Sequence, residues 1–389
     1  MVNPLKYGLN PQQGDASFAF AADAEWLRVL HGTLGYMNVL DAAKAWQLAR
    51  ELGLAFNRPA ATSIKHVHPA GAALASPIDE AFQLAHLLAK DEWSPLATAY
   101  ARARAGDRVA SFGDFIGVSE TVDESCARLI AREVSDGIVA PGYAPEALRV
   151  LREKKRGRYI ILEADPSYEP PTLEERTEFG ITLRQARNAA VIAPSLFERV
   201  VTTSSPLAGD AVADLVLATI VAKHAPSNAV CVAHAGQAIG VGGGQQARIY
   251  ATDLACSKAD LWRLQLHPRA SEVVLPPDAN RTARFNAVRK WLTWDRLDDA
   301  DRRRLRDVAQ HLPPPLDARE QHEWLTKFSP VVMSSDGYIP FRDNVDRARR
   351  SGIHAIAQPG GSANDNLVTV AADESGIAMV HTGLRLFWH

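Results

Sequence analysis

The chain has 389 residues, which exceeds the size at which one hydrophobic core stops growing, so two or more domains are expected. Its apolar content of 47% and charged content of 23% are those of an ordinary globular protein. The 43 basic and 45 acidic residues nearly cancel, so no global charge favours binding to nucleic acid or to an anionic membrane.

The cysteines and the apolar stretches bear on the compartment. Cys126, Cys231 and Cys256 are far apart and form no Cys-x-x-Cys pair, which predicts reduced, buried thiols. The first residues lack the basic and then apolar pattern of a secretory signal. The most apolar helix candidate, residues 211–222, contains Asp214 and is too short to cross a bilayer. We therefore expect a cytoplasmic protein with no membrane partner.

The chain opens with a stretch rich in turn formers, residues 6–13, which predicts an ordered loop. Apolar residues at helical spacing predict a helix over residues 38–52, with Asn38 as its N-cap and Gly53 at its end. A short strand is then expected to end at Lys65.

Helix and strand patterns alternate over the next hundred residues, which predicts an α/β layer architecture. The expected elements are a helix over 76–88 with Ser76 as N-cap, a strand over 109–116, a helix over 122–133, a strand over 137–140, a helix over 145–154 and a strand over 159–162.

Three prolines among polar residues at 165–172 predict a domain boundary, so we expect a first unit over 1–168 and a second over 169–389. The elements expected in the second unit are a helix over 207–222, a strand over 229–234, a glycine-dense turn over 238–244, a helix over 249–266, a strand and turn over 331–339, a helix over 344–351, a strand over 353–357, a helix over 363–374 and a strand over 377–381.

Between these elements lies a charged stretch, residues 281–320, that contains Arg302, Arg303 and Arg304. Basic residues with interspersed tryptophans can mark an RNA-binding surface, but aspartates alternate with the arginines here. The pattern favours a solvated helical insertion, at about 270–328, over an RNA surface.

The two units resemble each other. Ser111–Ile116 parallels Ser334–Ile339, and Val139–Gly142 parallels Ala357–Gly360. The surroundings of His66 resemble those of His234. We expect two copies of one α/β unit, with a ligand site near their junction.

The stretch Ser63–Gly71 is the expected centre of the chemistry. It predicts a short strand that runs into a turn at Pro69 and places Lys65 and His66 at its rim. A histidine can accept a proton near neutral pH, and an adjacent ammonium can stabilise a developing oxyanion. Together they suit acyl or formyl transfer, although a Lys-His pair alone is also common at solvated strand ends.

Seven stretches, in order along nearly the whole chain, resemble motifs of the AICAR transformylases, the formyl-transferring part of a bifunctional purine-biosynthesis enzyme. They are Lys6–Pro11, Ile64–Gly71, Ser111–Phe115, Glu133–Ile138 with Ala140–Tyr143, Gly244–Ile249, Pro340–Ala348 and Leu384–Phe387. The resemblance implies a tandem pair of cytidine-deaminase-like three-layer units and a homodimer with active sites at the subunit interface. It does not extend to the family's IMP cyclohydrolase domain, so a separate cyclohydrolase is an expected partner.

The implied activity is that of a phosphoribosylaminoimidazolecarboxamide formyltransferase, which moves a formyl group from 10-formyltetrahydrofolate to the 5-amino group of AICAR. The related zinc deaminases need His-x-Glu and Pro-Cys-x-x-Cys motifs. Neither motif occurs in this sequence, so no zinc is expected.

The resemblance also assigns roles to single residues. It implies catalytic roles for Lys65, His66 and Asn228. The residues implied to bind the AICAR nucleotide are Lys6, Tyr7, Asn38, Asp136 and Arg385. Those implied to bind the folate are Phe112, Gly113, Arg248, Ile249, Pro340 and Phe341. Ser227 and Asp336 match positions at which some members bind potassium.

The sequence departs from the family at Lys6, where arginine is usual, and at Gln12, which replaces a common histidine. Lysine lacks the bidentate fork of arginine, so the phosphate contact is expected to be looser or shared with another residue. A role for His68 in structure is favoured over contact with substrate. The alternative to an enzyme is a non-catalytic subunit that binds AICAR or folate and docks a separate cyclohydrolase.

Overall fold

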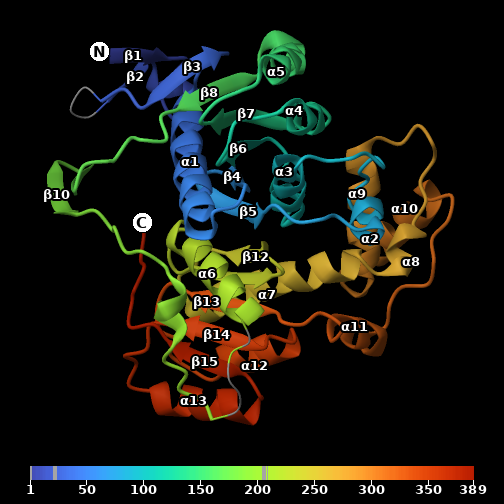
Figure 1. The fold of residues 1–389 in the computed structure, drawn as a ribbon. Coiled ribbons are helices and arrows are strands. Elements are labelled where there is room, and N and C mark those ends of the chain that lie inside the picture. The colour runs from blue at the N-terminus through green and yellow to red at the C-terminus, as the bar shows by residue number, and fades with distance from the viewer. Residues whose placement is uncertain (1, 21–23, 204–206, 208) are drawn as a thin grey trace.

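A mixed sheet of eleven strands runs through the protein and carries helices on both faces (Figure 1). The structure is a computed structural model, and it describes residues 2–20, 24–203, 207 and 209–389. The strand order is β15-β14-β13-β11-β12-β5-β4-β6-β7-β8-β3. No helix in these ranges combines the length and the apolar character that crossing a bilayer would require.

The same series of elements occurs twice along the chain. The first copy consists of α1 (Tyr36–Phe56), β4 (Ala60–Lys65), β5 (His68–Leu74), α3 (Pro95–Ala105), β6 (Asp114–Val118), α4 (Glu124–Ala131), β7 (Ser135–Ala140), α5 (Pro145–Gly157) and β8 (Ile160–Ala164). The second copy consists of α6 (Gly209–Lys223), β11 (Val230–His234), β12 (Gln237–Gly242), α7 (Arg248–Gln265), β13 (Val332–Ser335), α12 (Asp343–Arg350), β14 (Ala355–Gln358), α13 (Asp365–Glu374) and β15 (Ala378–His381).

Strand pairing is also the same in the two copies. Each begins with an antiparallel hairpin, β4–β5 or β11–β12, whose first strand pairs antiparallel with β6 or β13. Two parallel strands follow in each copy. The copies meet where β5 and β12 pair antiparallel at Ala73 and Gln237, so both belong to one sheet.

Two apolar cores lie on opposite faces of the sheet. Helices α1 and α6 cover one face and share a core that includes Leu48 and Leu217. Helices α3, α4, α5, α7, α12 and α13 cover the other face and share a core that includes Ile116 and Met333. Since both cores contain residues from both copies, burial of apolar surface joins the copies.

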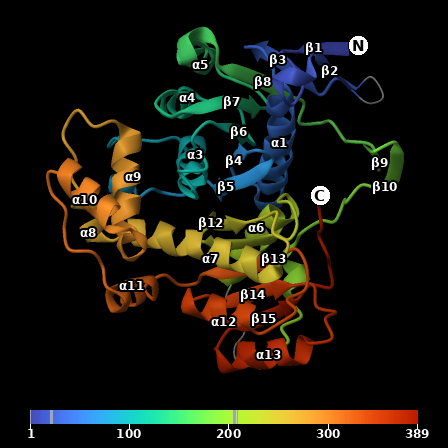
Figure 2. The same ribbon diagram turned by 180° about the vertical axis from the view of Figure 1, so that it is seen from behind.

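Several elements lie outside the repeat. They are β1 (Val2–Leu5), η1 (Pro11–Gln13), β2 (Ala16–Ala19), β3 (Leu27–His31), α2 (Glu80–Ala85), β9 (Leu173–Glu178), β10 (Ile181–Ala186), η3 (Pro194–Phe197), α8 (Pro268–Ser271), α9 (Arg281–Leu292), η4 (Trp294–Arg296), α10 (Asp299–Val308) and α11 (Ala318–Leu325). The β9–β10 hairpin and the helices α8–α11 stand at opposite ends of the molecule in both views (Figures 1 and 2).

The expected α/β architecture and the helical insertion are confirmed, as are the buried free cysteines. The charged insertion is not solvated throughout, because it has a small core of its own around the buried Trp291. The boundary at residues 168 and 169 stays a prediction.

Some predicted elements were wrong. Residues 76–88 were expected to form one helix capped by Ser76, but α2 begins only after Asp79, whose side chain accepts a hydrogen bond from the Phe82 N–H. Helix α1 starts at Tyr36 rather than Asn38, and its N-cap is Gly35. It also continues past Gly53 to the left-handed Asn57.

The expected glycine-dense turn at 238–244 is largely strand β12. Glycines are required there because α7 lies against the strand. A Cβ on Gly240 would be 2.1 Å from the carbonyl oxygen of Ala255, and one on Gly242 would be 2.2 Å from that of Ala251.

Register corrects part of the predicted repeat. Val139–Gly142 and Ala357–Gly360 do occupy equivalent positions, because Val139 pairs with Gly117 as Ala357 pairs with Ser334. Ser111–Ile116 and Ser334–Ile339 do not, since the first stretch enters its strand and the second leaves it.

Candidate functional site

The β4–β5 hairpin turn carries the Lys-His pair. Lys65 and His68 close the turn, and the two residues between them, His66 and Val67, have φ of 51° and 64°. Positive φ at both positions of a two-residue loop is a type I′ turn, which glycine and asparagine usually form. His66 is exposed at the tip, and Lys65 is half-buried.

The equivalent turn of the second copy is closed by His234 and Gln237 and has Ala235 and Gly236 between them, with φ of 49° and 74°. His234 therefore corresponds to Lys65, and the predicted match between His234 and His66 is off by one residue. Ala235 takes the position of His66, so the second turn has no ionisable side chain there.

The Lys65 ammonium is fixed by backbone oxygens. Its Nζ donates to the carbonyls of Phe112 (2.9 Å) and Gly113 (2.8 Å). Gly113 has φ of 76°, and a Cβ there would lie 3.0 Å from Lys65 Nζ. A larger residue would be strained at this φ and would crowd the ammonium, and Phe112 beside Gly113 is 49% exposed.

Asp41 of α1 lies behind the turn and was not found from the sequence. Its Oδ1 accepts the Val67 N–H at 2.6 Å, and the residue is 9% exposed. Burial raises the pKa of Asp41, while the Val67 N–H and the nearby His66 and Lys65 side chains oppose that rise. The Asp41 carboxylate therefore contacts the turn that carries the two candidate catalytic residues.

Asn38 and Asp136 are both half-buried. The Oδ1 of Asn38 accepts the Gly35 N–H at 2.9 Å at the start of α1, three residues before Asp41. Asp136, near the start of β7, faces the same group, since its Oδ1 is 3.9 Å from a Cβ built on Gly113.

A cationic hollow adjoins Asp136. It has a volume of about 390 Å³ and is lined by Lys6, Lys155, Arg156 and Arg158. Lys155 Nζ lies 2.5 Å from Asp136 Oδ1, which joins the hollow to the Lys65 group. The last three cations were not predicted. Four positive side chains around a space of this size suit an anion such as a phosphate group.

The remaining predicted residues gather in the second copy around Arg248, which is 6% exposed. Its guanidinium pairs with Asp336 and donates to Asn228 Oδ1 (2.6 Å). The Asn228 amide donates to the carbonyl oxygens of Gln245 (2.8 Å) and Gln246 (3.3 Å). Asn228, which directly precedes β11, thus connects that strand to the loop between β12 and α7.

Asp336 is the position at which potassium was expected. One of its carboxylate oxygens accepts from Arg248 and the other from the Ser227 hydroxyl at 2.5 Å, and each oxygen keeps a further lone pair. Potassium binding there stays a prediction. In the described ranges no three His, Cys, Asp or Glu side chains are grouped as metal ligands would be.

The residues predicted to bind folate divide by exposure. Phe341 is 61% exposed, whereas Ile249 and Pro340 are half-buried. Arg385, which was predicted to bind the nucleotide, is exposed, and its guanidinium lies 5.0 Å from the ring centre of Phe387. These residues offer apolar and aromatic surface, whereas the Arg248 cation is already neutralised.

His68 and the C-terminal tail connect the two groups. The His68 ring donates to the His66 carbonyl at 2.7 Å, and its Nε2 is 3.1 Å from a Cβ built on Gly244. Lys44 of α1 lies over Trp388 at 3.6 Å, and the Trp388 N–H donates to the Ser227 hydroxyl at 3.1 Å. The predicted structural role of His68 agrees with these contacts.

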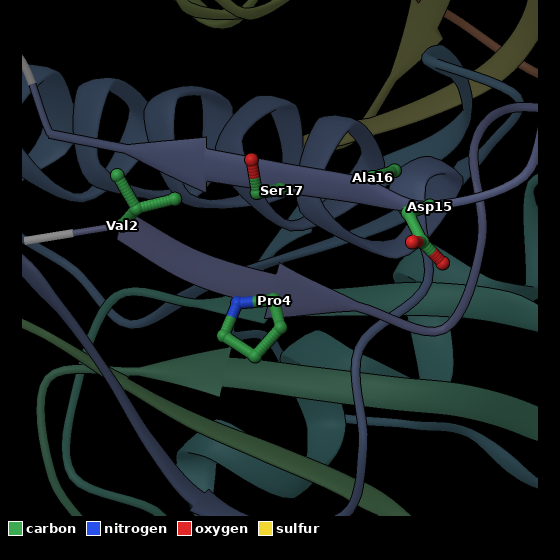
Figure 3. Close-up of a pocket in the computed structure, with 5 residues that line it drawn as sticks. All are labelled: Val2, Pro4, Asp15, Ala16 and Ser17. Carbon is green, nitrogen blue, oxygen red and sulfur yellow. The ribbon is translucent and has the colours of Figure 1, made fainter.

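A second hollow, of about 230 Å³, lies at the β1–β2 hairpin (Figure 3). Val2, Pro4, Asp15, Ala16 and Ser17 line it, and its side chains are small or apolar apart from one carboxylate. None of them is among the candidate catalytic residues, and we assign it no role.

Comparison with known proteins gives a family. Residues 1–258 match the family model described as AICARFT/IMPCHase bienzyme. The chain is 30% identical, over 99% of its length, to the bifunctional purine biosynthesis protein PurH of Sorangium cellulosum, and 32% identical, over its full length, to the PurH of Mesorhizobium japonicum. It spans 58% and 59% of the lengths of these two relatives.

Proposed function

The chain belongs to the AICARFT/IMPCHase bienzyme family, and on that basis we propose that it transfers a formyl group from 10-formyltetrahydrofolate to the 5-amino group of AICAR, giving FAICAR in purine biosynthesis. The observation that carries this proposal is the Lys65–His66 turn. Lysine has three N–H donors, and two of those of Lys65 reach backbone carbonyls. One donor is left for a developing oxyanion.

In the proposed mechanism the amine of AICAR attacks the formyl carbon. The amine is a weak nucleophile because its lone pair is delocalised into the imidazole and the carboxamide. His66 accepts the proton that the amine loses, directly or through the carboxamide. Lys65 stabilises the tetrahedral oxyanion and helps to protonate the departing folate nitrogen.

The residues proposed to bind the substrates come from the group around Lys65 and the group around Arg248. We propose that the cationic hollow holds the phosphate of AICAR, with Lys155, Arg156 and Arg158 adding to the grip of Lys6. Tyr7, Asn38, Asp136 and Arg385 remain the proposed contacts of the nucleotide. Exposed Phe112 and Phe341, with Gly113, Ile249 and Pro340, are proposed to contact the folate.

We propose that Asn228 orients the formyl group, through the lone pair of its Oδ1 that Arg248 does not use. Arg248 then acts on the reaction by holding Asn228, and no step uses a potassium ion.

A second copy of the chain is the proposed partner, with the active sites at the interface. The β9–β10 hairpin supports this, because every residue of both strands is exposed. Ile181 and Leu183 lie on one of its faces and Leu173, which pairs with Ala186, on the other, and an isolated two-stranded hairpin cannot bury these side chains alone. A cyclohydrolase supplied by another chain remains a proposed further partner, and each copy of the repeat is proposed to be a cytidine-deaminase-like unit.

The test is a formyl-transfer assay that follows the release of tetrahydrofolate from 10-formyltetrahydrofolate in the presence of AICAR. Turnover that requires both compounds supports the enzyme. If both bind and saturate without turnover, the chain is a non-catalytic binding subunit. Sedimentation measurements on the same preparation, repeated with Leu183→Glu, test the dimer.

A further inference from the structure

We propose that Asp41 is a positioning residue for formyl transfer: its buried carboxylate holds the His66–Val67 turn and thereby sets the directions of Lys65 and His66. The inference rests on the proposed function, and it adds a residue to which neither the sequence motifs nor the comparisons give a role.

The turn needs a restraint because of its residues. Val67 has φ of 64° although it is β-branched, and His66 precedes it at 51°. A β-branched residue rarely adopts positive φ, and two successive residues other than glycine at positive φ are also rare. Without an anchor, the backbone of residues 65–68 would favour other conformations, which would redirect both side chains.

Asp41 supplies that restraint from a rigid element. It lies in the second turn of α1, 9% exposed, and its Oδ1 accepts the Val67 N–H at 2.6 Å. A charged acceptor makes a stronger hydrogen bond than a neutral one, and in a buried place it is less weakened by water. The anchored N–H belongs to the residue that directly follows His66.

The second copy repeats the device without the chemistry. Asp214 of α6, 3% exposed, accepts the N–H groups of Ala235 (2.7 Å) and Gly236 (2.6 Å) in the equivalent turn. The same helix in both copies thus provides a carboxylate to the same turn. In the second copy a glycine occupies the position of Val67, so that turn is less strained.

This repeat provides a matched control. Asp41→Ala and Asp214→Ala each remove a buried carboxylate from a type I′ turn, and both should lower the melting temperature. Asp41→Ala should also lower kcat about 100-fold with little change in either KM, since displacing catalytic groups by about 1 Å has an effect of this size. Asp214→Ala should leave the kcat of the folded protein at the parent value.

A second variant pair tests positioning directly. Val67→Gly makes the first turn like the second, because glycine adopts positive φ without strain. Added to Asp41→Ala, it should restore much of the lost kcat. Asp41→Asn keeps an acceptor oxygen and should stay within about tenfold of the parent, since a neutral hydrogen bond replaces a charged one.

The outcomes are distinct. Equal effects of Asp41→Ala and Asp214→Ala on kcat would reduce Asp41 to a stabilising residue, and a double variant no better than Asp41→Ala would exclude positioning. If Asp41→Ala does not fold, the kcat of Asp41→Asn is the deciding measurement. A kcat within about tenfold of the parent supports positioning by the hydrogen bond, whereas a 100-fold loss of kcat would mean that the charge itself is required and would contradict it. A parent protein without turnover would instead overturn the proposed function, and this role with it.

Discussion

The two hairpin turns of the repeat have the same backbone and different surroundings. Both have two residues at positive φ and a buried aspartate behind them. The second turn is closed by Gln237, which is 1% exposed and donates to the Arg102 carbonyl, and by His234, whose ring donates to the Pro330 carbonyl. In the first turn His66 is exposed and Lys65 has an unused donor.

The comparison separates what the fold needs from what the chemistry needs. A turn at positive φ with a carboxylate behind it occurs in both copies, so that arrangement belongs to the fold, and the first copy adds strain at Val67. Lys65 and the exposed His66 occur at the turn of the first copy, so the candidate site belongs to that copy.

The largest effect is expected for the catalytic pair itself. Lys65→Ala and His66→Ala should each lower kcat by about 10²–10⁴, the range that removal of a general acid or base produces. His234→Ala, at the position that corresponds to Lys65, should lower stability and leave kcat unchanged. Steady-state kinetics with circular dichroism melting would measure both, and near-normal turnover of His66→Ala would contradict the assignment.

A smaller effect is expected at the helix that precedes each copy's fifth strand. In the first copy α5 ends with Lys154, Lys155 and Arg156, and in the second α13 ends with Asp373 and Glu374. Removing Arg156 should raise the KM for AICAR about tenfold, the value of one hydrogen bond to a charged group, with little change in kcat. Kinetics at two salt concentrations would show whether the contact is ionic.

Arg158→Ala should act in the same direction as Arg156→Ala, and Glu374→Gln is the control from the second copy. Since Glu374 pairs with the exposed Arg342, its removal should leave the KM for AICAR as it is. An unchanged KM in both arginine variants would remove the hollow from the proposed phosphate site.

The smallest effect concerns the contact between the copies' equivalent helices. Glu51 of α1 binds Lys223 (2.8 Å), the last residue of α6, and His224 (2.7 Å), which directly follows that helix. Burial alone would raise the pKa of Glu51, but the His224 hydrogen bond and the Lys223 charge hold it below its usual value. Glu51→Gln should lower the free energy of unfolding by about 1–3 kcal/mol, the cost of leaving buried partners unpaired.

The pH dependence of that prediction follows from linkage. Because the folded-state pKa of Glu51 is lower than the unfolded value near 4.5, its contribution is complete above pH 4.5 and is lost as the pH falls through the folded value. The difference in unfolding free energy between parent and Glu51→Gln should therefore shrink in acid. A difference that stays constant down to low pH would contradict the ionic contribution.

The sequence predicted well those elements whose pattern is local. The strands and helices from Glu124 to Ala164 follow from alternation and proline positions, and Val139 and Ala357 were matched correctly because each precedes a Pro-Gly turn. Strand β12 was missed because its glycines imitate a turn. They are there because α7 lies almost on the strand, a contact between elements that composition does not reveal.

The candidate site divides in the same way. Lys65 and His66 were found from a turn predicted at Pro69, but Pro69 lies in strand β5 and the turn is formed by His66 and Val67. The structure keeps Lys65 beside Gly113. Asp41 comes from another helix, and its only local signal was an acidic residue beside the buried Ala42 on the apolar face of α1. The added cations of the hollow follow a helix end whose position near Lys6 depends on the fold.

The seam between β5 and β12 limits how the protein can be divided. Ala73 pairs with Gln237 there and the Leu74 N–H donates to the Gly236 carbonyl, both strands are interior to the sheet, and both apolar cores continue across them. A fragment containing either copy alone would present a long bare strand edge with hydrophobic surface above and below it. Such edges recruit other chains into aggregates, so engineering a half-length version would require a substitute for the absent copy before it could remain in solution.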